Sequence, residues 1–77
     1  MFYIIAIFNY EGNTVSREYY SIDKIIYETP SGKQEVSGEQ ILTYAFPLKR
    51  TLYLQGENAN YVIDTSKLVS LEISKSN

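Results

Sequence analysis

Tyrosine is the residue type in this 77-residue chain best suited to specific contacts: the chain has eight tyrosines and no histidine, cysteine or tryptophan. An exposed tyrosine offers a large ring with little rotamer entropy to lose and a hydroxyl that can hydrogen-bond, so tyrosine is enriched at protein interfaces. Tyr20 and Tyr53 share their strand faces with Thr, Ser, Glu and Gln, and we expect both rings to be exposed binding residues. We expect Tyr3, Tyr19 and Tyr61 to be half-buried strand formers.

Lys49 and Arg50 form the only adjacent pair of basic residues. With the nearby Tyr53 they could stack against and grip a single nucleic-acid strand, as small barrels do. The chain as a whole is acidic, with nine Asp and Glu against seven Lys and Arg. Because neutralised phosphates supply most non-specific nucleic-acid affinity, this balance disfavours a nucleic-acid partner, and a solvated loop is the simpler interpretation of the pair.

The side chains that most enzymes use are missing from the sequence. Without histidine or cysteine there is no Ser-His pair, no thiolate and no N- or S-ligated metal site. A pair of carboxylates could still act as acid and base, but the nine acids fall mainly in turns and on polar strand faces. The four glycines form no phosphate-binding motif. We therefore expect a protein that is not an enzyme and takes no cofactor, metal or small-molecule substrate.

The first element is an unbroken apolar run at residues 2–8, which predicts a central strand covered on both faces. Gly12-Asn13 is typical of a two-residue hairpin turn, which would place Tyr10 opposite Val15 in a second strand at residues 14–21. Ile22-Asp23 would form a corner. Four further strands follow from their composition and alternation, at residues 24–29, 33–37 (an edge strand), 51–55 and 61–64, and a closing strand at 68–74 places Val69, Leu71 and Ile73 on one side.

Residues 37–47 allow two interpretations. Ser37 and Gln40 have the spacing of a helix capping box, and the apolar residues that follow are close to helical spacing. Thr43, Tyr44 and Phe46 are strand formers, and Pro47 would end a helix after about two turns. The sequence predicts one short helix near residues 38–46, with an extended strand as the alternative.

These elements predict a mainly β fold, namely a small antiparallel β-barrel or sandwich of 5–7 short strands built from hairpins, in a single domain spanning residues 1–77. A chain of this size buries only about 60% of its unfolded surface, so its stability is marginal without additional support. Disulfides and N/S metal sites are excluded by composition. Oligomerisation is the support that remains.

The sequence therefore predicts a non-catalytic β module that acts by protein-protein interaction, as a homo-oligomer or an accessory or inhibitory protein. The alternative is an OB or Sm-like small barrel that binds single-stranded nucleic acid through Tyr20, Tyr53, Lys49 and Arg50. No Lys or Arg precedes the apolar run, which is also too short to span a membrane. We expect a cytoplasmic protein without a membrane partner.

Overall fold

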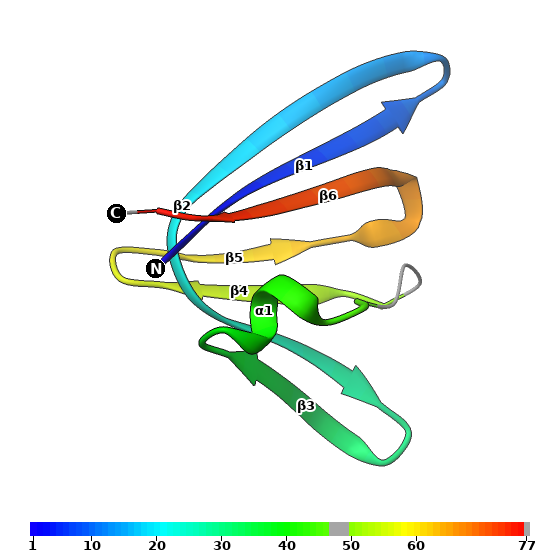
Figure 1. Cartoon of the computed structure of the whole chain (residues 1–77). Helices are drawn as coiled ribbons and strands as arrows, with labels where there is room; N and C mark the ends of the chain where they lie inside the picture. Colours follow the sequence, from blue (N-terminus) through cyan, green and yellow to red (C-terminus); the bar gives the residue numbers. More distant parts are fainter. Residues whose placement is uncertain (47–49, 77) are drawn as a thin grey trace.

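The chain folds into a single antiparallel sheet with one short helix, as a computed structural model that describes residues 1–46 and 50–76 shows. Its elements are β1 (Phe2–Tyr10), β2 (Asn13–Thr29), β3 (Gly32–Ser37), α1 (Gln40–Thr43), β4 (Leu52–Gly56), β5 (Asn60–Ile63), the 3-10 turn η1 (Thr65–Lys67) and β6 (Leu68–Lys75). Within the described residues the strand order is β5-β4-β2-β1-β6, and β3 pairs with β2 (Figure 1). The predicted mainly β fold with one short helix is confirmed.

The first strand alternates strictly between its two faces. Phe2, Ile4, Ala6 and Phe8 are buried, whereas the side chains between them are half-buried. The expectation that β1 is covered on both faces is therefore wrong. The sheet curves around its inner face, and no second apolar layer of described residues packs on its outer face. The apolar residues on the outer face of β1 therefore stay partly exposed.

The first hairpin turns at Glu11-Gly12, not at Gly12-Asn13 as predicted. Both turn residues have positive φ, +50° and +87°, as a two-residue turn of this hand requires. The register consequently moves by two residues, and Val15 lies opposite Phe8. This register pairs Phe8 with Val15 and Ile4 with Tyr19 on the inner face of the hairpin. Because strand faces alternate with a period of two, the shift leaves every predicted face assignment unchanged.

The predicted corner at Ile22-Asp23 is a bulged bend inside one continuous strand. The β2 ladder with β1 slips by one residue at Ser21, and its ladder with β4 slips between Ile22 and Lys24. Ser21 takes a left-handed conformation with φ +55°. Bulges increase strand twist and bending, and Figure 1 shows β2 curving through this region. Its first half pairs with β1, and its second half pairs with β3 and β4.

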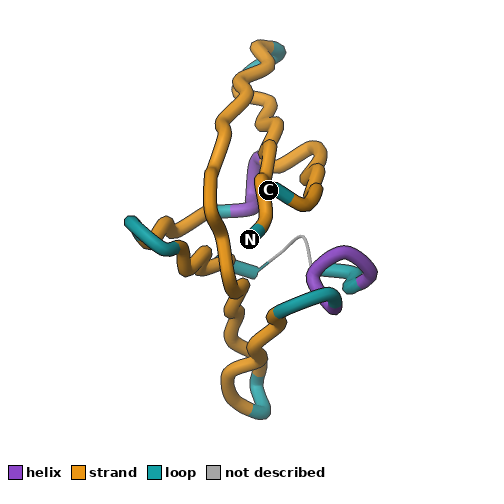
Figure 2. Tube along the Cα trace, turned by 60° about the vertical axis from the view of Figure 1, so that its left-hand side comes forward, coloured by secondary structure: helices purple, strands orange, loops and turns teal. Residues whose placement is uncertain are grey.

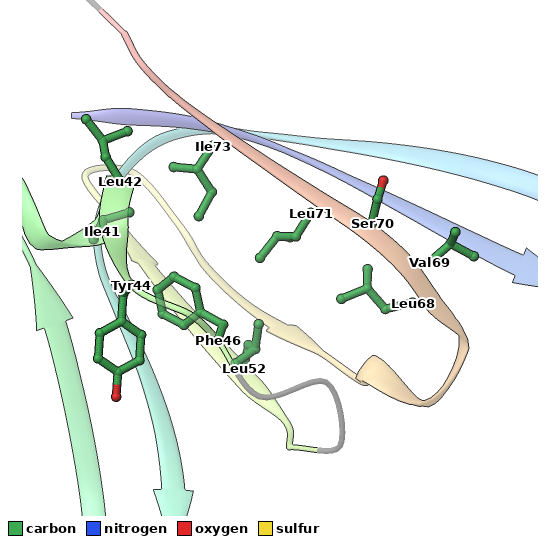
Figure 3. Close-up of a pocket in the computed structure, with 10 residues that line it drawn as sticks. All are labelled: Ile41, Leu42, Tyr44, Phe46, Leu52, Leu68, Val69, Ser70, Leu71 and Ile73. Atoms are coloured by element: carbon green, nitrogen blue, oxygen red, sulfur yellow. The ribbon is translucent and has the colours of Figure 1, made fainter.

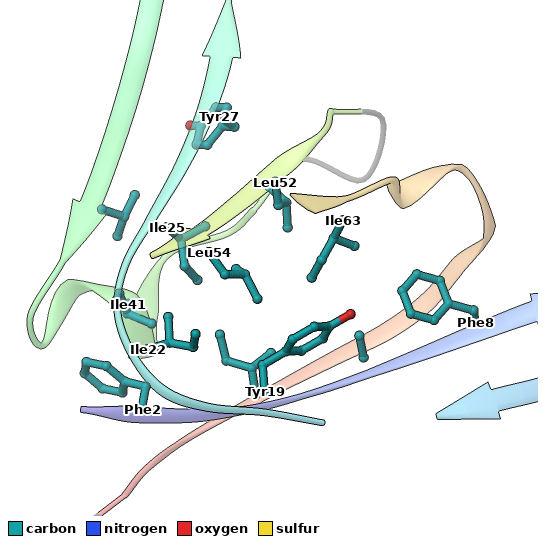
Figure 4. Close-up of a cluster of buried hydrophobic side chains, with 13 residues drawn as sticks. Phe2, Phe8, Tyr19, Ile22, Ile25, Tyr27, Ile41, Leu52, Leu54 and Ile63 are labelled. Atoms are coloured by element: carbon teal, nitrogen blue, oxygen red, sulfur yellow. The ribbon is translucent and has the colours of Figure 1, made fainter. Parts of the chain in front are cut away.

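The bend brings the inner faces of the two halves of the sheet together around one core. Ile22, Ile25 and Leu54 are completely buried at its centre (Figure 4). The core cluster consists of Phe2, Ile4, Ala6, Phe8, Tyr19, Ile22, Ile25, Tyr27, Val36, Ile41, Leu52, Leu54 and Ile63. The turns of the β1–β2 and β2–β3 hairpins lie at opposite ends of the molecule, at the top and bottom of Figure 2.

The sheet is folded over but forms an open path in the described residues, since no ladder joins β5 back to β6. The connection between these strands runs through η1. There the Thr65 hydroxyl donates a hydrogen bond of 2.6 Å to the carbonyl oxygen of Arg50. This bond fixes the start of β6 against the segment that leads into β4.

The short helix α1 lies within the predicted range, but its start differs from the prediction. Glu39 occupies the N-cap without a side-chain cap hydrogen bond, and Ser37 is the last residue of β3. The capping-box prediction is therefore wrong. Burial of Ile41 in the core and a 2.7 Å ion pair between Glu39 and Lys75 connect the helix to the sheet.

The closing strand β6 contains a second departure from the predicted pattern. Its ladder with β1 slips next to Phe8, so that Leu68 lies opposite Phe8. Val69 falls in the irregularity and is 61% exposed. The prediction that Val69 shares the inner side with Leu71 and Ile73 is wrong for Val69 and holds for the other two, which pack against the core.

The bend predicts that glycine is tolerated better than valine at Ser21, and that valine is tolerated better than glycine at Ser16. Ser21→Val should lower the free energy of unfolding by about 1–2 kcal/mol, because a β-branched residue resists positive φ, whereas Ser21→Gly should be tolerated. At Ser16, an exposed position of the regular strand, valine should be tolerated and glycine should cost about 0.5–1 kcal/mol. Urea denaturation of the four variants checks this, and the same order of preference at both serines would contradict the bend.

Candidate interaction surfaces

Tyr20 lies on the outer face of β2 and is 61% exposed, as its flanking residues indicated. Its ring stacks on Tyr3 of β1, with ring centroids 5.0 Å apart and an interplanar angle of 30°. Both tyrosine hydroxyls donate to Glu18: that of Tyr3 to Oε1, and that of Tyr20 to Oε2 at 3.3 Å. The three side chains form one ordered cluster on the outside of the sheet.

Glu18 perturbs the titration of Tyr3. The hydrogen bond to this carboxylate raises the pKa of the Tyr3 hydroxyl well above its usual range, with smaller contributions from burial and from the negative charge of Glu18. The neutral tyrosine is the favoured form because it can donate to the carboxylate, whereas a phenolate would be repelled by it. The raised pKa therefore keeps Tyr3 as a hydrogen-bond donor to Glu18 at neutral pH.

Tyr53 lies on the outer face of the other half of the sheet and is 36% exposed. Its cross-strand neighbours are Ile26 on β2 and Val62 on β5, so the three side chains form an apolar row across three strands. Val62 is 69% exposed. The row lines a shallow hollow of about 300 Å³ together with polar and charged residues, among them Glu28 and Lys33.

The structure brings together two of the four predicted binding residues. Arg50 and Tyr53 line one hollow of about 260 Å³, which they share with Thr51 and Glu28. Tyr20 does not line this hollow and belongs to the half of the sheet on the other side of the bend. Lys49 lies outside the described residues.

The sequence interpretation missed the apolar residues on the outer faces. Ile5 and Ile7 were assigned to a strand covered on both sides, yet both are half-buried. Val62 was predicted to lie in a strand, but its side chain was not assigned to either face of the sheet. For β1 a signal was present, because the polar Asn9 continues the outward series that begins at Tyr3. For Val62 only the register with Tyr53 reveals the contact.

An open groove of about 480 Å³ lies between α1 and β6 (Figure 3). Most of its lining side chains are apolar, and none of those in the described part of the chain is a carboxylate, Lys or Arg; the residues are Ile41, Leu42, Tyr44, Phe46, Leu52, Leu68, Val69, Ser70, Leu71 and Ile73. Tyr44 contacts Phe46 with ring centroids 5.0 Å apart, and its hydroxyl hydrogen-bonds that of Tyr27. The groove is an opening of the core, and the hydroxyls of Tyr44 and Ser70 are the polar side-chain groups of its described lining.

Two kinds of feature are absent from residues 1–46 and 50–76. No three or more Asp and Glu side chains gather where they could hold a metal ion, and no helix there has the length and apolar character needed to cross a membrane. Comparison of the chain with protein-family models, curated proteins and solved structures gives no match. The chemistry of its own surfaces is therefore the basis for a functional proposal.

The tyrosine cluster predicts an unusual alkaline titration. Tyr3 should ionise well above the ordinary tyrosine pKa of about 10, and Glu18→Gln should lower its pKa towards that value. Because the pKa of Tyr3 is higher in the folded than in the unfolded state, the hydrogen bond from Tyr3 to Glu18 should stabilise the folded state fully below about pH 10. This stabilisation should disappear as the pH rises through the folded-state pKa of Tyr3. Phenolate absorbance of the protein minus that of Tyr3→Phe isolates this group. Ionisation of Tyr3 near pH 10 in the unmodified chain would show that the hydrogen bond does not form.

Proposed function

We propose that the protein is a non-catalytic β module that acts by protein-protein contact, in the simplest case as a homo-oligomer. The observation that supports this most directly is the apolar row of Ile26, Tyr53 and Val62, which includes two exposed side chains on a regular part of the sheet. A ring such as that of Tyr53 contributes large contact area at low entropic cost. A second copy is the partner with the best-matched charges.

The charges around this row have both signs. We use the name mixed-charge face for the row and its charged neighbours, which together are Lys24, Ile26, Glu28, Lys33, Glu35, Tyr53 and Val62. Glu28 and Lys33 are direct cross-strand partners, and Lys24 and Glu35 form an ion pair of 3.8 Å. In a two-fold dimer the same patch faces itself, so Glu28 of one copy can meet Lys33 of the other. The face is therefore electrostatically self-complementary.

The size of the molecule is compatible with such a dimer. A standard interface takes about 800 Å² from each partner, which is under a fifth of the 5210 Å² accessible surface of the chain. A small domain has a limited core, so it gains proportionally more from additional burial than a large one. An accessory or inhibitory role, exerted through such contacts in the cytoplasm, is the biological setting that we propose.

The second candidate function is binding of single-stranded nucleic acid on a small barrel of OB or Sm-like type. In this alternative the folded sheet is an incompletely closed barrel, and β5 and β6 are the two strands on either side of the gap. The hollow shared by Arg50 and Tyr53 favours it, because a cation beside an aromatic ring can hold a phosphate and a base. Glu28 in the same hollow and the net charge of −2 oppose it.

Sedimentation equilibrium of the whole chain tests self-association. We expect a monomer-dimer equilibrium, with the dissociation constant raised roughly tenfold or more by Tyr53→Ala and by Val62→Ser. Tyr10→Ala is the matched control, because it removes a 45% exposed tyrosine of β1 that lines neither hollow of the mixed-charge face, and it should change nothing. A chain that stays monomeric up to about 1 mM, or an equal effect of Tyr10→Ala, would overturn the proposal.

The alternative has its own test in a fluorescent single-stranded oligonucleotide at low ionic strength. If it were correct, binding would weaken steeply with salt and would be lost in Arg50→Glu. Under the proposed function, we expect no binding above that of a matched acidic control protein. Tight, salt-sensitive binding that depends on Arg50 would replace the proposed function by the alternative.

A further inference from the structure

The outer face of the other half of the sheet has a different chemistry from the mixed-charge face. We use the name acidic face for six outward side chains of β1, β2 and β6: Tyr3, Ile5, Ile7, Glu18, Tyr20 and Glu72. Tyr3, Ile5 and Ile7 are half-buried and lie in a line along β1. They form an apolar strip about 13 Å long, since alternate residues of a strand are about 6.6 Å apart.

The register of the sheet places one carboxylate on each side of this strip. Ile5 lies opposite Glu18 on β2 and opposite Glu72 on β6. Neighbouring strands are about 4.8 Å apart, so the two glutamates lie on strands about 10 Å apart. Tyr20 extends the apolar strip sideways by stacking on Tyr3.

The acidic face carries two carboxylates and no basic residue at its own outward positions. In the described part of the chain, no Lys or Arg occupies an outward position of β1, of β6 or of the half of β2 that pairs with β1. Arg17 occupies an inner-face position opposite Ala6, but its side chain is exposed and lines a hollow with Glu18 and Tyr20 at the β2 edge of the acidic face. Lys75, at the end of β6, forms its ion pair with Glu39.

This charge pattern selects among possible partners. If two copies docked through their acidic faces, four carboxylates would come together with no cation at an outward position between them. The mixed-charge face has lysines beside its glutamates and does not meet this repulsion. A nucleic acid or an anionic surface would be repelled for the same reason. An apolar strip between two carboxylates is complementary to an apolar stripe bordered on both sides by cations.

We propose that the acidic face binds a basic amphipathic segment of another protein, a partner beyond the self-association proposed above. Apolar side chains of the segment would cover Tyr3, Ile5 and Ile7, and Lys or Arg on each side would reach Glu18 and Glu72. An α-helix fits these dimensions, because its diameter of about 10–12 Å matches the separation of the two acidic strands and about two and a half turns cover the strip.

Glu18 is held in position for this role. Its two oxygens accept hydrogen bonds from Tyr3 and Tyr20, which restrict the carboxylate on the exposed face. A carboxylate has about four acceptor sites, so it can receive these two bonds and still accept from a cation. Glu72 is exposed and supplies the second charge on the opposite side of the strip.

The test uses three synthetic amphipathic helical peptides of about 18 residues, long enough for about five turns. The first has a leucine stripe bordered on both sides by lysine, the second has glutamate in place of lysine, and the third has serine in place of leucine. Each is titrated into the whole ¹⁵N-labelled chain and followed by amide chemical shifts. We expect saturable binding of the first peptide only, with shifts at Ile5, Ile7, Glu18 and Glu72, and affinity that falls with added salt.

Two charge-neutralised double variants separate this face from the rest of the molecule. Glu18→Gln with Glu72→Gln should weaken binding of the lysine peptide roughly tenfold or more, while Glu28→Gln with Glu35→Gln, the matched control on the mixed-charge face, should leave it unchanged. Ile5→Ser tests the apolar strip independently of charge and should also weaken binding. The amide spectrum of each free variant verifies its fold.

Several outcomes would overturn the proposal. These are no binding of the lysine peptide, equal binding of the glutamate peptide, shifts confined to the mixed-charge face, or equal effects of the two double variants. Self-association is measured separately by sedimentation without peptide, and the Glu18 and Glu72 variant should leave it unaltered. Failure of one proposal is thus distinguishable from failure of the other.

Discussion

The bulged bend of β2 at Ser21–Asp23 is the constraint on which the rest of the structure depends. This strand is shared by both halves of the sheet, pairing with β1 before the bend and with β3 and β4 after it. Without the bend, a strand of 17 residues would run about 57 Å, and the two apolar faces could not meet. With it, Ile22, Ile25 and Leu54 are completely buried in one core.

The same bend separates the outside of the molecule into two chemically different faces. Strand alternation commits every second residue to the core, and the residues between them are free to carry other chemistry. After the bend these outward positions hold an apolar row among balanced charges; before it they hold an apolar strip between Glu18 and Glu72. One small sheet thus carries a surface of mixed charge and an acidic surface.

Much of this arrangement follows from local sequence patterns. Alternation predicted the strands, and polar neighbours predicted that the rings of Tyr20 and Tyr53 are exposed. These features depend on residues that are close in sequence. For that reason a single chain contains enough information to predict them.

The remaining features depend on pairings that local patterns do not specify. The hairpin turn could lie at Gly12-Asn13, as predicted, or at Glu11-Gly12, as observed. Which of the two forms depends on how Val15 and Tyr19 pair with β1. The bulge at Ser21 has no diagnostic residue, since serine carries the positive φ that glycine usually supplies. The acidic face joins β2, β1 and β6 across more than 50 residues of sequence, so Glu72 could be placed beside Ile5 only from the sheet register.

The most direct test of this division into two faces is a dilution series of amide spectra of the free protein, from about 1 mM to about 10 µM. The account predicts concentration-dependent shifts at Ile26, Tyr53 and Val62, with Ile5, Glu18 and Glu72 unchanged. Shifts centred on Ile5, Glu18 and Glu72 would contradict it, because that face could then associate with itself despite its uncompensated carboxylates.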